Sequence, residues 1–124
     1  KVQYLLKEDI KEYIEMQKVI TEVKVVKNIA ISKGLQTKIY RREDLAKIAD
    51  TLLFFNDIEL SFVIAKTANN ITSISGRSIG KKSIANILSR IGGGGDKMGG
   101  AAQFENLPIS KVSEKLNQAI KEEE

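Results

Sequence analysis

Cysteine and histidine are both absent from the 124 residues of this chain. Without cysteine there are no disulfides, thiolate zinc sites or thiol nucleophiles. The absence of histidine removes the commonest general base and the commonest metal ligand. Any chemistry that this chain carries out alone must use carboxylates, hydroxyls, lysines or backbone amides. No run of about 18 apolar residues occurs, so the sequence offers no candidate transmembrane helix.

Charge and length set the next limits. Twenty basic and sixteen acidic residues give a net charge of +4. Because both signs are interspersed, this charge suits an anionic ligand without requiring nucleic acid. The length and a hydrophobic content of 42% predict a single domain over residues 1–124. The chain starts at Lys1 and ends in three glutamates, and we expect it to be one piece of a longer protein.

The first half of the sequence predicts two helices with a hairpin between them. Apolar residues at helical spacing predict an amphipathic helix over residues 5–20. Alternating valines and isoleucines over 22–32 predict two short strands, with a turn at Lys27 and Asn28. A period of 3.6 over 42–55 predicts the next helix, with Asp44 and Asp50 on its solvated side.

The second half of the sequence continues in the same manner. A strand starting at residue 60 and a turn at 67–70 lead into a partner strand over 71–78, and this hairpin should be central to the sheet. Ser83 is expected to cap a helix that Gly92 stops. A short strand over 101–104 and a helix opened by Pro108 and Ser110 follow.

These elements define the fold class. The predicted order is α-β-β-α-β-β-α-β-α, an α/β (α+β) domain. One mixed sheet of about five strands is flanked by helices. The seven aromatic side chains are expected to face the core.

The glycine-rich segment is the strongest local signal. Gly92, Gly93, Gly94 and Gly95 precede Asp96 without interruption. Consecutive glycines allow positive φ and close approach of a ligand, and inward-turned amides form an anion-binding nest. The same run would also serve as a flexible connector. The pattern alone leaves both interpretations open.

Arg77 is the second candidate. It ends a predicted strand beside Ser75 and Ser78, where it is either a solvated edge charge or a bidentate phosphate contact. The segment Gly76–Ser83 does not match a phosphate-binding P-loop, because its glycines are too close together and Lys82 intervenes before the serine. The carboxylates show no metal-site spacing, so no metal ligand is predicted in this chain.

Several segments, taken in order, resemble one family. They are SFVIAK at 61–66, ISGRS at 74–78, GGGG at 92–95 and AA at 101–102, with upstream matches at 38–40 and 46–53. From about residue 20 to its end, the chain resembles the C-terminal DHH-associated domain of the DHH phosphoesterases. Within that family it is most similar to the bacterial cyclic-di-AMP phosphodiesterase branch.

The resemblance implies a division of labour. A separate Asp-His-His domain would bind two manganese ions and hydrolyse cyclic-di-AMP to pApA, while this chain holds the substrate and is inactive by itself. The implied contacts are Arg77, Ser78 and the backbone of Gly92–Gly95. Asp96 stands where the family loop carries a histidine. The parent protein would act at the cytoplasmic face, anchored to the membrane through upstream segments.

Other functions fit the same resemblance. Within the family, the alternative is an oligoribonuclease or 3′,5′-bisphosphate nucleotide phosphatase, for which the partner is a short oligonucleotide. Outside enzymology, the domain could serve as a non-catalytic nucleic-acid-binding module, with affinity that falls steeply with salt. A third interpretation is that its helices mediate homodimerisation.

Overall fold

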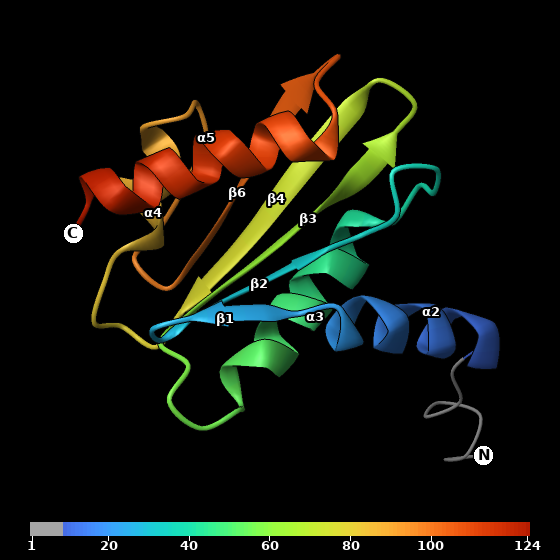
Figure 1. The fold of residues 1–124 in the computed structure, drawn as a ribbon, viewed down its shortest axis with the longest axis horizontal. Coiled ribbons are helices and arrows are strands. Elements are labelled where there is room, and N and C mark those ends of the chain that lie inside the picture. Colours follow the sequence, from blue (N-terminus) through green and yellow to red (C-terminus); the bar gives the residue numbers. More distant parts are fainter. Residues whose placement is uncertain (1–8) are drawn as a thin grey trace.

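The structure, a computed structural model, describes residues 9–124 as one open mixed sheet with helices on both faces (Figure 1). The predicted start of the first helix, residues 5–8, lies outside the described part. The elements are α2 (Ile10–Thr21), β1 (Lys24–Val26), β2 (Ile29–Lys33), α3 (Arg42–Leu53), β3 (Leu60–Ala68), β4 (Ile71–Ser78), α4 (Ile84–Ser89), β5 (Gly94–Gly95), β6 (Gly99–Glu105) and α5 (Ile109–Glu122).

The sheet has the strand order β1-β2-β3-β4-β6-β5. Only β2 and β3 run parallel, and the other neighbours are antiparallel. The α+β class, the mixed sheet and the central hairpin are therefore confirmed. The predicted count of about five strands is low by one, because Gly94 and Gly95 pair with β6 instead of forming a loop.

Local sequence signals explain where several elements begin and turn. The Asp9 side chain accepts hydrogen bonds from the first-turn amides of α2, and Ser83 caps α4 in the same way, as predicted. Lys27 adopts φ 57° in the turn between β1 and β2. The predicted turn at 67–70 is shorter than expected, because Thr67 and Ala68 continue β3 beyond a register shift.

Two hydrophobic cores lie on opposite faces of the sheet. One packs α4 and α5 against side chains such as Phe62 and Ile74, and the other packs α2 and α3 against Val63 and Ala65. Neighbouring residues of β3 thus face different cores, as the pleat requires. Because α3 lies against β3 and β4, the same face of β6 and β5 stays uncovered beside it.

Two expectations about burial are wrong. Phe54 and Phe55, just after α3, are 87% and 55% exposed, so the aromatic residues do not all face the core. Asp44 is buried at 8% exposure, because Arg41 binds its carboxylate through two nitrogens at 3.0 and 3.1 Å. Asp50 is on the solvated side of α3 as predicted.

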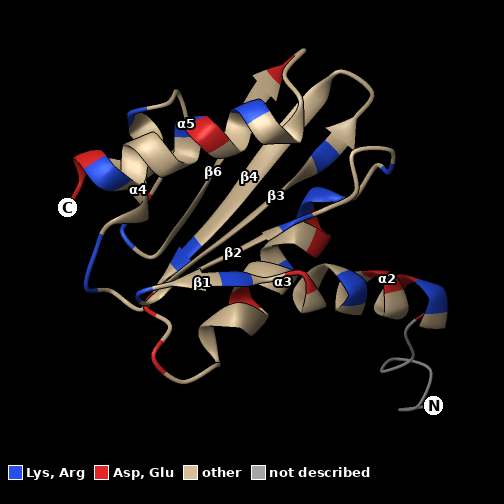
Figure 2. Cartoon of the chain, viewed as in Figure 1, with Lys and Arg blue, Asp and Glu red and all other residues tan. Residues whose placement is uncertain are grey.

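Charges are sparse on the middle of the sheet. Figure 2 shows both signs alternating along α2 and α5, whereas β3, β4 and β6 carry few charged residues. Arg77, near the end of β4, is one of these few. Its ion-pair partner, Asp50, comes from α3 and not from a neighbouring strand.

Candidate functional site

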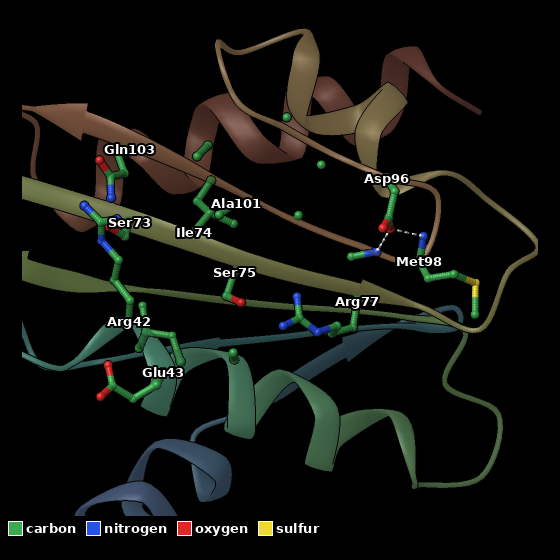
Figure 3. Close-up of a pocket in the computed structure, with 17 residues that line it drawn as sticks. Arg42, Glu43, Ser73, Ile74, Ser75, Arg77, Asp96, Met98, Ala101 and Gln103 are labelled. Carbon is green, nitrogen blue, oxygen red and sulfur yellow. Dashed lines mark hydrogen bonds between the residues drawn. The ribbon is translucent and has the colours of Figure 1, made fainter.

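A groove of about 840 Å³ runs between α3, the uncovered face of β4 and β6, and the β5–β6 hairpin. Its walls come from three distant parts of the chain. Polar and charged side chains line it together with glycine and alanine backbone, as Figure 3 shows. Its polar lining is Arg42, Glu43, Ser73, Ser75, Arg77, Asp96 and Gln103.

Alternation along β4 builds the floor. Ser73, Ser75 and Arg77 occupy every second position and so share one face of the strand. Both serines are buried, at 3% and 7% exposure. The Ser73 hydroxyl lies 2.7 Å from that of Thr67. Ser75 points into the groove, and its hydroxyl has no hydrogen-bond partner within residues 9–124, so it is available to a ligand.

Arg77 is held in place by two contacts. Its Nε donates to Asp50 Oδ1 at 2.9 Å, and its Nη1 donates to the Gly76 carbonyl at 2.8 Å. Gly99 is its register partner on β6, and a Cβ there would lie 3.0 Å from Nη1. The lack of a side chain at Gly99 therefore gives the guanidinium room beside the strand.

The β5–β6 hairpin forms one end of the groove through very close backbone packing. A Cβ on Gly93 would lie 2.6 Å from Ala102 Cβ, and one on Gly95 would collide with Gly100 and Gly99. Gly95 also has φ 145°, a conformation that favours glycine. At Gly94, by contrast, a Cβ would meet nothing within 4 Å. Gly94 is thus the glycine of this hairpin that lines the groove with open space beside it.

Asp96 closes the hairpin turn. Its Oδ1 accepts hydrogen bonds from the amides of Met98 and Gly99, both at 2.9 Å (Figure 3). This is an Asx-type turn, a role that the short side chains of Asp and Asn fill well. The backbone carbonyl of Asp96 also accepts from Ala85 at the start of α4. Asp96 therefore has a structural task as well as a place in the lining of the groove.

The structure brings together only part of the predicted site. Arg77, Gly94, Gly95 and Asp96 line the groove, whereas Gly92 and Gly93 do not. Ser78 lies on the opposite face of β4 from Arg77. It is 2% exposed, and its hydroxyl donates to the Lys82 carbonyl and accepts from the Gly80 amide. Ser78 organises the 79–82 loop and does not reach the groove.

Among the polar groove residues that the sequence did not predict are Arg42, Ser73 and Gln103. The signal for Ser73 was present, because the period of two in Thr-Ser-Ile-Ser-Gly-Arg-Ser puts residues 73, 75 and 77 on one face. Gln103 is the register partner of Ser73 and follows once β4 and β6 are paired. No pattern in the sequence points to Arg42, which approaches β4 only through the packing of α3.

A second hollow of about 970 Å³ lies between α5 and the β1–β2 hairpin. Its floor is apolar, with Ile29 and Ile31, and its rim mixes lysines with glutamates. It is larger than the groove, yet it contains none of the predicted site residues. Two of its rim charges already pair, since Lys27 lies 3.8 Å from Glu124. We therefore place the candidate site in the groove beside α3.

Two ionisable groups away from the groove have shifted pKa values. The pKa of Glu15 is lowered, mainly by its hydrogen bond with Lys38 and next by that with Lys18. The pKa of Arg41 is raised, chiefly by its hydrogen bond to Asp44. Neither residue lines the groove, so these pairs fasten α2, α3 and the 34–41 loop and do not tune ligand chemistry.

Metal-binding side chains do not gather in the described part of the chain. Among residues 9–124 there is no group of three or more histidine, cysteine, aspartate or glutamate side chains that could hold an ion. Across the same residues, no helix is both long and apolar enough to cross a bilayer. The groups that the groove offers to a ligand include a guanidinium, hydroxyls and exposed backbone.

Comparisons with known proteins relate the chain to phosphodiesterases. No family model matches the chain. Cyclic-di-AMP phosphodiesterase GdpP of Geobacillus thermodenitrificans is 34% identical over 120 residues, which is 96% of this chain and 18% of the relative. GdpP of Bacillus subtilis is 32% identical over 98% of this chain and 19% of its own length. The chain thus spans about a fifth of these relatives.

Two solved structures share the fold. An exopolyphosphatase-related protein of Bacteroides fragilis superposes with a TM-score of 0.81 at 19% identity, over 94% of this chain and 36% of that one. The pGpG-specific phosphodiesterase PggH of Vibrio cholerae gives 0.64 at 16% identity, over 91% and 40%. The predicted resemblance is confirmed: along nearly its whole length, this chain is homologous to one segment of the cyclic-di-AMP phosphodiesterases.

Proposed function

We propose that this chain is the substrate-binding domain of a phosphodiesterase that converts cyclic-di-AMP to pApA. The observation that carries the proposal is the groove in which Arg77, Ser75 and the glycine hairpin converge. Homology to cyclic-di-AMP phosphodiesterases supports the substrate class. The chain spans about a fifth of those relatives, and we assign the hydrolytic machinery to another part of the parent protein.

Arg77 is the phosphate contact in this proposal. A guanidinium carries five N–H donors, and two of them are engaged by Asp50 and Gly76. The other donors are available to phosphate oxygens, and the two existing contacts fix the plane in which they point. A fixed planar fork loses little conformational entropy on binding, which favours phosphate over a diffuse anion. The unpaired Ser75 hydroxyl adds a further donor on the same face.

The hairpin supplies shape. At Gly94 the backbone borders the groove with open space where a side chain would be, so a nucleotide can approach the main chain closely. Ser78 has no part in this proposal, because its hydroxyl is already used on the other face of the strand. Ser75 takes the place that the resemblance gave to Ser78.

Catalysis is assigned to a separate Asp-His-His domain of the parent protein, acting with manganese, and this chain alone is inactive. The lack of histidine here is consistent with that division. Bound metal ions in such a domain activate water for attack on phosphorus. This chain would hold the phosphodiester toward that centre. We place the parent at the cytoplasmic face, with a membrane anchor in its other segments.

The other partner in this proposal is the catalytic domain itself. Ile10, Tyr13 and Ile14 on α2 are 71%, 48% and 45% exposed, an apolar row that a lone monomer would leave in water. We assign this row to contact with the catalytic domain rather than to a homodimer. Light scattering of the isolated chain should give the mass of a monomer. A dimer that dissociates in the Ile14→Lys variant would instead assign this row to a homodimer interface.

The test is ligand binding to the 124-residue chain. Titration with cyclic-di-AMP, followed by ¹H–¹⁵N NMR, should shift the amide signals of β4 and of the β5–β6 hairpin. Arg77→Ala should weaken binding about 10- to 100-fold, the size expected for a lost hydrogen bond to a charged group. Lys47→Gln is the control, because Lys47 is exposed on α3 outside the groove.

Two outcomes would contradict the proposal. Shifts confined to the hollow beside α5, or unchanged affinity in Arg77→Ala, would remove the assigned site. Titration with pApA and with a longer oligonucleotide distinguishes the alternatives. Preference for the linear dinucleotide would favour the oligoribonuclease branch, and affinity that rises with oligonucleotide length would favour a nucleic-acid-binding module.

A further inference from the structure

Arg42 is, besides Arg77, the other cationic side chain among the described residues that line the groove. It is exposed at the first position of α3, and within residues 9–124 it makes no ion pair or hydrogen bond through its side chain. Figure 3 shows its guanidinium reaching from α3 toward Ser73 and Gln103, whereas the neighbouring Glu43 points away from the strands. Arg42 therefore brings a guanidinium without an ion-pair partner, among residues 9–124, to the end of the groove opposite the glycine hairpin.

The neighbouring arginine gives a useful contrast. Arg41 is bound by Asp44 and also lies 3.2 Å from Glu12, so it joins α2 to α3. Arg42 has no such structural partner. A cation in the first turn of a helix is also electrostatically unfavourable, because the helix N-terminus carries partial positive charge. Neither packing nor helix stability therefore explains an arginine at position 42.

The distance between the two ends of the groove can be estimated along α3 and, separately, along β4. Arg42 lies eight residues before Asp50, the partner of Arg77, which is about 12 Å along a helix. Ser73 lies four residues before Arg77, which is about 13 Å along a strand. The two lengths agree, and because α3 packs along β4 one arginine lies toward each end of the groove. Long side chains allow both guanidinium groups to turn toward a ligand between them.

We propose that Arg42 binds the second anionic group of the ligand, so that the groove selects molecules with two phosphates over those with one. Ser75, buried at 7% exposure and without a partner, lies between the two arginines on the groove floor. The arrangement suits a dinucleotide, with Arg77 on one phosphate and Arg42 on the other. This inference rests on the proposed function and adds a residue that distinguishes ligands with two phosphates from ligands with one.

The experiment compares two probes on matched variants. Cyclic-di-AMP carries two phosphates and 5′-AMP carries one, and each is titrated into the 124-residue chain and into Arg42→Gln, Arg77→Gln and Lys47→Gln. Arg42→Gln should weaken cyclic-di-AMP binding about tenfold and change 5′-AMP binding less than about twofold. Arg77→Gln should weaken both. Lys47→Gln removes one charge from the same helix outside the groove and should change neither by more than about twofold.

The outcomes separate this inference from the function on which it rests. If cyclic-di-AMP binds and Arg42→Gln weakens both probes equally, or weakens neither, the assignment of Arg42 is wrong while the proposed function stands. If the unmodified chain binds no cyclic-di-AMP at millimolar concentration, both fail. Unfolding temperatures of all variants, expected to agree closely because none of the three side chains is buried in a core, exclude misfolding as the cause.

Discussion

At the scale of single residues, Asp96 combines two opposing effects. Its carboxylate stabilises the hairpin turn by accepting the Met98 and Gly99 amides. The same charge lies in the lining of a groove that we assign to a phosphate ligand. Two unit charges 4 Å apart in water interact by about 1 kcal/mol, and more where water is excluded. The two backbone amides spread part of that charge, which reduces the repulsion without removing it.

Replacing Asp96 with asparagine separates these effects. Asparagine keeps the acceptor oxygen, so the hairpin and the unfolding temperature should be nearly unchanged. Loss of the charge should tighten cyclic-di-AMP binding about two- to fivefold, measured by calorimetry at low salt, because about 1 kcal/mol of repulsion disappears. Added salt should shrink the gain. Weaker binding in Asp96→Asn would instead mean that the carboxylate receives a hydrogen bond from the ligand.

Glu15 provides a pH-dependent contact between α2 and the following loop. Its carboxylate lies 2.7 Å from Lys38 and 3.2 Å from Lys18, and its pKa is lowered, first by the Lys38 hydrogen bond. A lowered pKa in the folded state means that the contact stabilises the fold above the ordinary glutamate value and is lost as pH falls through the lowered one. Neutral pH therefore keeps the contact.

The measurement is a carboxyl-detected NMR titration. Glu15 should titrate below its ordinary value, and Lys38→Gln should raise its midpoint more than Lys18→Gln does, since Lys38 is the larger cause. The difference in unfolding temperature between the original chain and Lys38→Gln should vanish in acid. A midpoint at the ordinary value in the unmodified chain would show that the pair does not persist in solution.

Inference from the sequence placed residues well where one side chain stands out and poorly where direction along a strand matters. Arg77 was singled out by its charge at a strand end, and it lines the groove. Ser78 was a contact implied by the family resemblance, but neighbours on a strand face opposite ways, and Ser75 shares the face of Arg77. Asp44 was expected to be solvated, because nothing in the sequence shows that Arg41 folds back over it.

At the scale of elements, the β5–β6 hairpin is the part that the sequence did not predict as a paired structure. Glycines carry no side chains, so they give no alternation from which to recognise a strand. The helices were predictable, because α3 and α5 repeat apolar residues every three to four positions. The hydrophobic period also placed β3 and β4 at the centre of the sheet. The additional strand, β5, depends on backbone contacts that only glycine permits.

Two neighbouring glycines of this hairpin should respond differently to substitution. Gly95→Ala should destabilise the fold by about 1–3 kcal/mol, because φ 145° is strained for alanine and its Cβ meets Gly100. Gly94→Ala should change stability by less than about 1 kcal/mol, because its Cβ meets no atom within 4 Å. Urea denaturation measures both.

Ligand affinity should follow a different order. Gly94→Val keeps the hairpin but puts a branched side chain into the groove, so it should weaken cyclic-di-AMP binding at least tenfold with little change in unfolding midpoint. Full affinity in Gly94→Val would show that the ligand does not approach this backbone. Equal unfolding midpoints for the alanine variants at positions 94 and 95 would contradict the packing described for β5.

At the scale of the whole molecule, the groove follows from how the two faces of the sheet are covered. On one face α4 and α5 pack across β3, β4 and β6. On the other, α2 and α3 cover only as far as β4. The uncovered strip beside α3 becomes a site because β4 places hydroxyls and a guanidinium there. Its location depends on long-range packing, which explains why Arg42 could not be recognised from the sequence.

The proposed function separates binding from catalysis. The chain has no histidine or cysteine, and its described residues bring no metal-binding group together. In the presence of millimolar Mn²⁺, the isolated chain should bind cyclic-di-AMP but release no pApA from it, because the metal-binding groups that activate water are assigned to another domain. Chromatography of the reaction mixture measures the product.

Adding a separately expressed Asp-His-His domain from the parent protein should restore turnover. Arg77→Ala should then lower kcat/KM of the reconstituted pair by one to two orders of magnitude, about 1.5–3 kcal/mol. Turnover by the isolated chain, abolished by Arg77→Ala, would place the catalytic groups in the groove itself and overturn the division of labour.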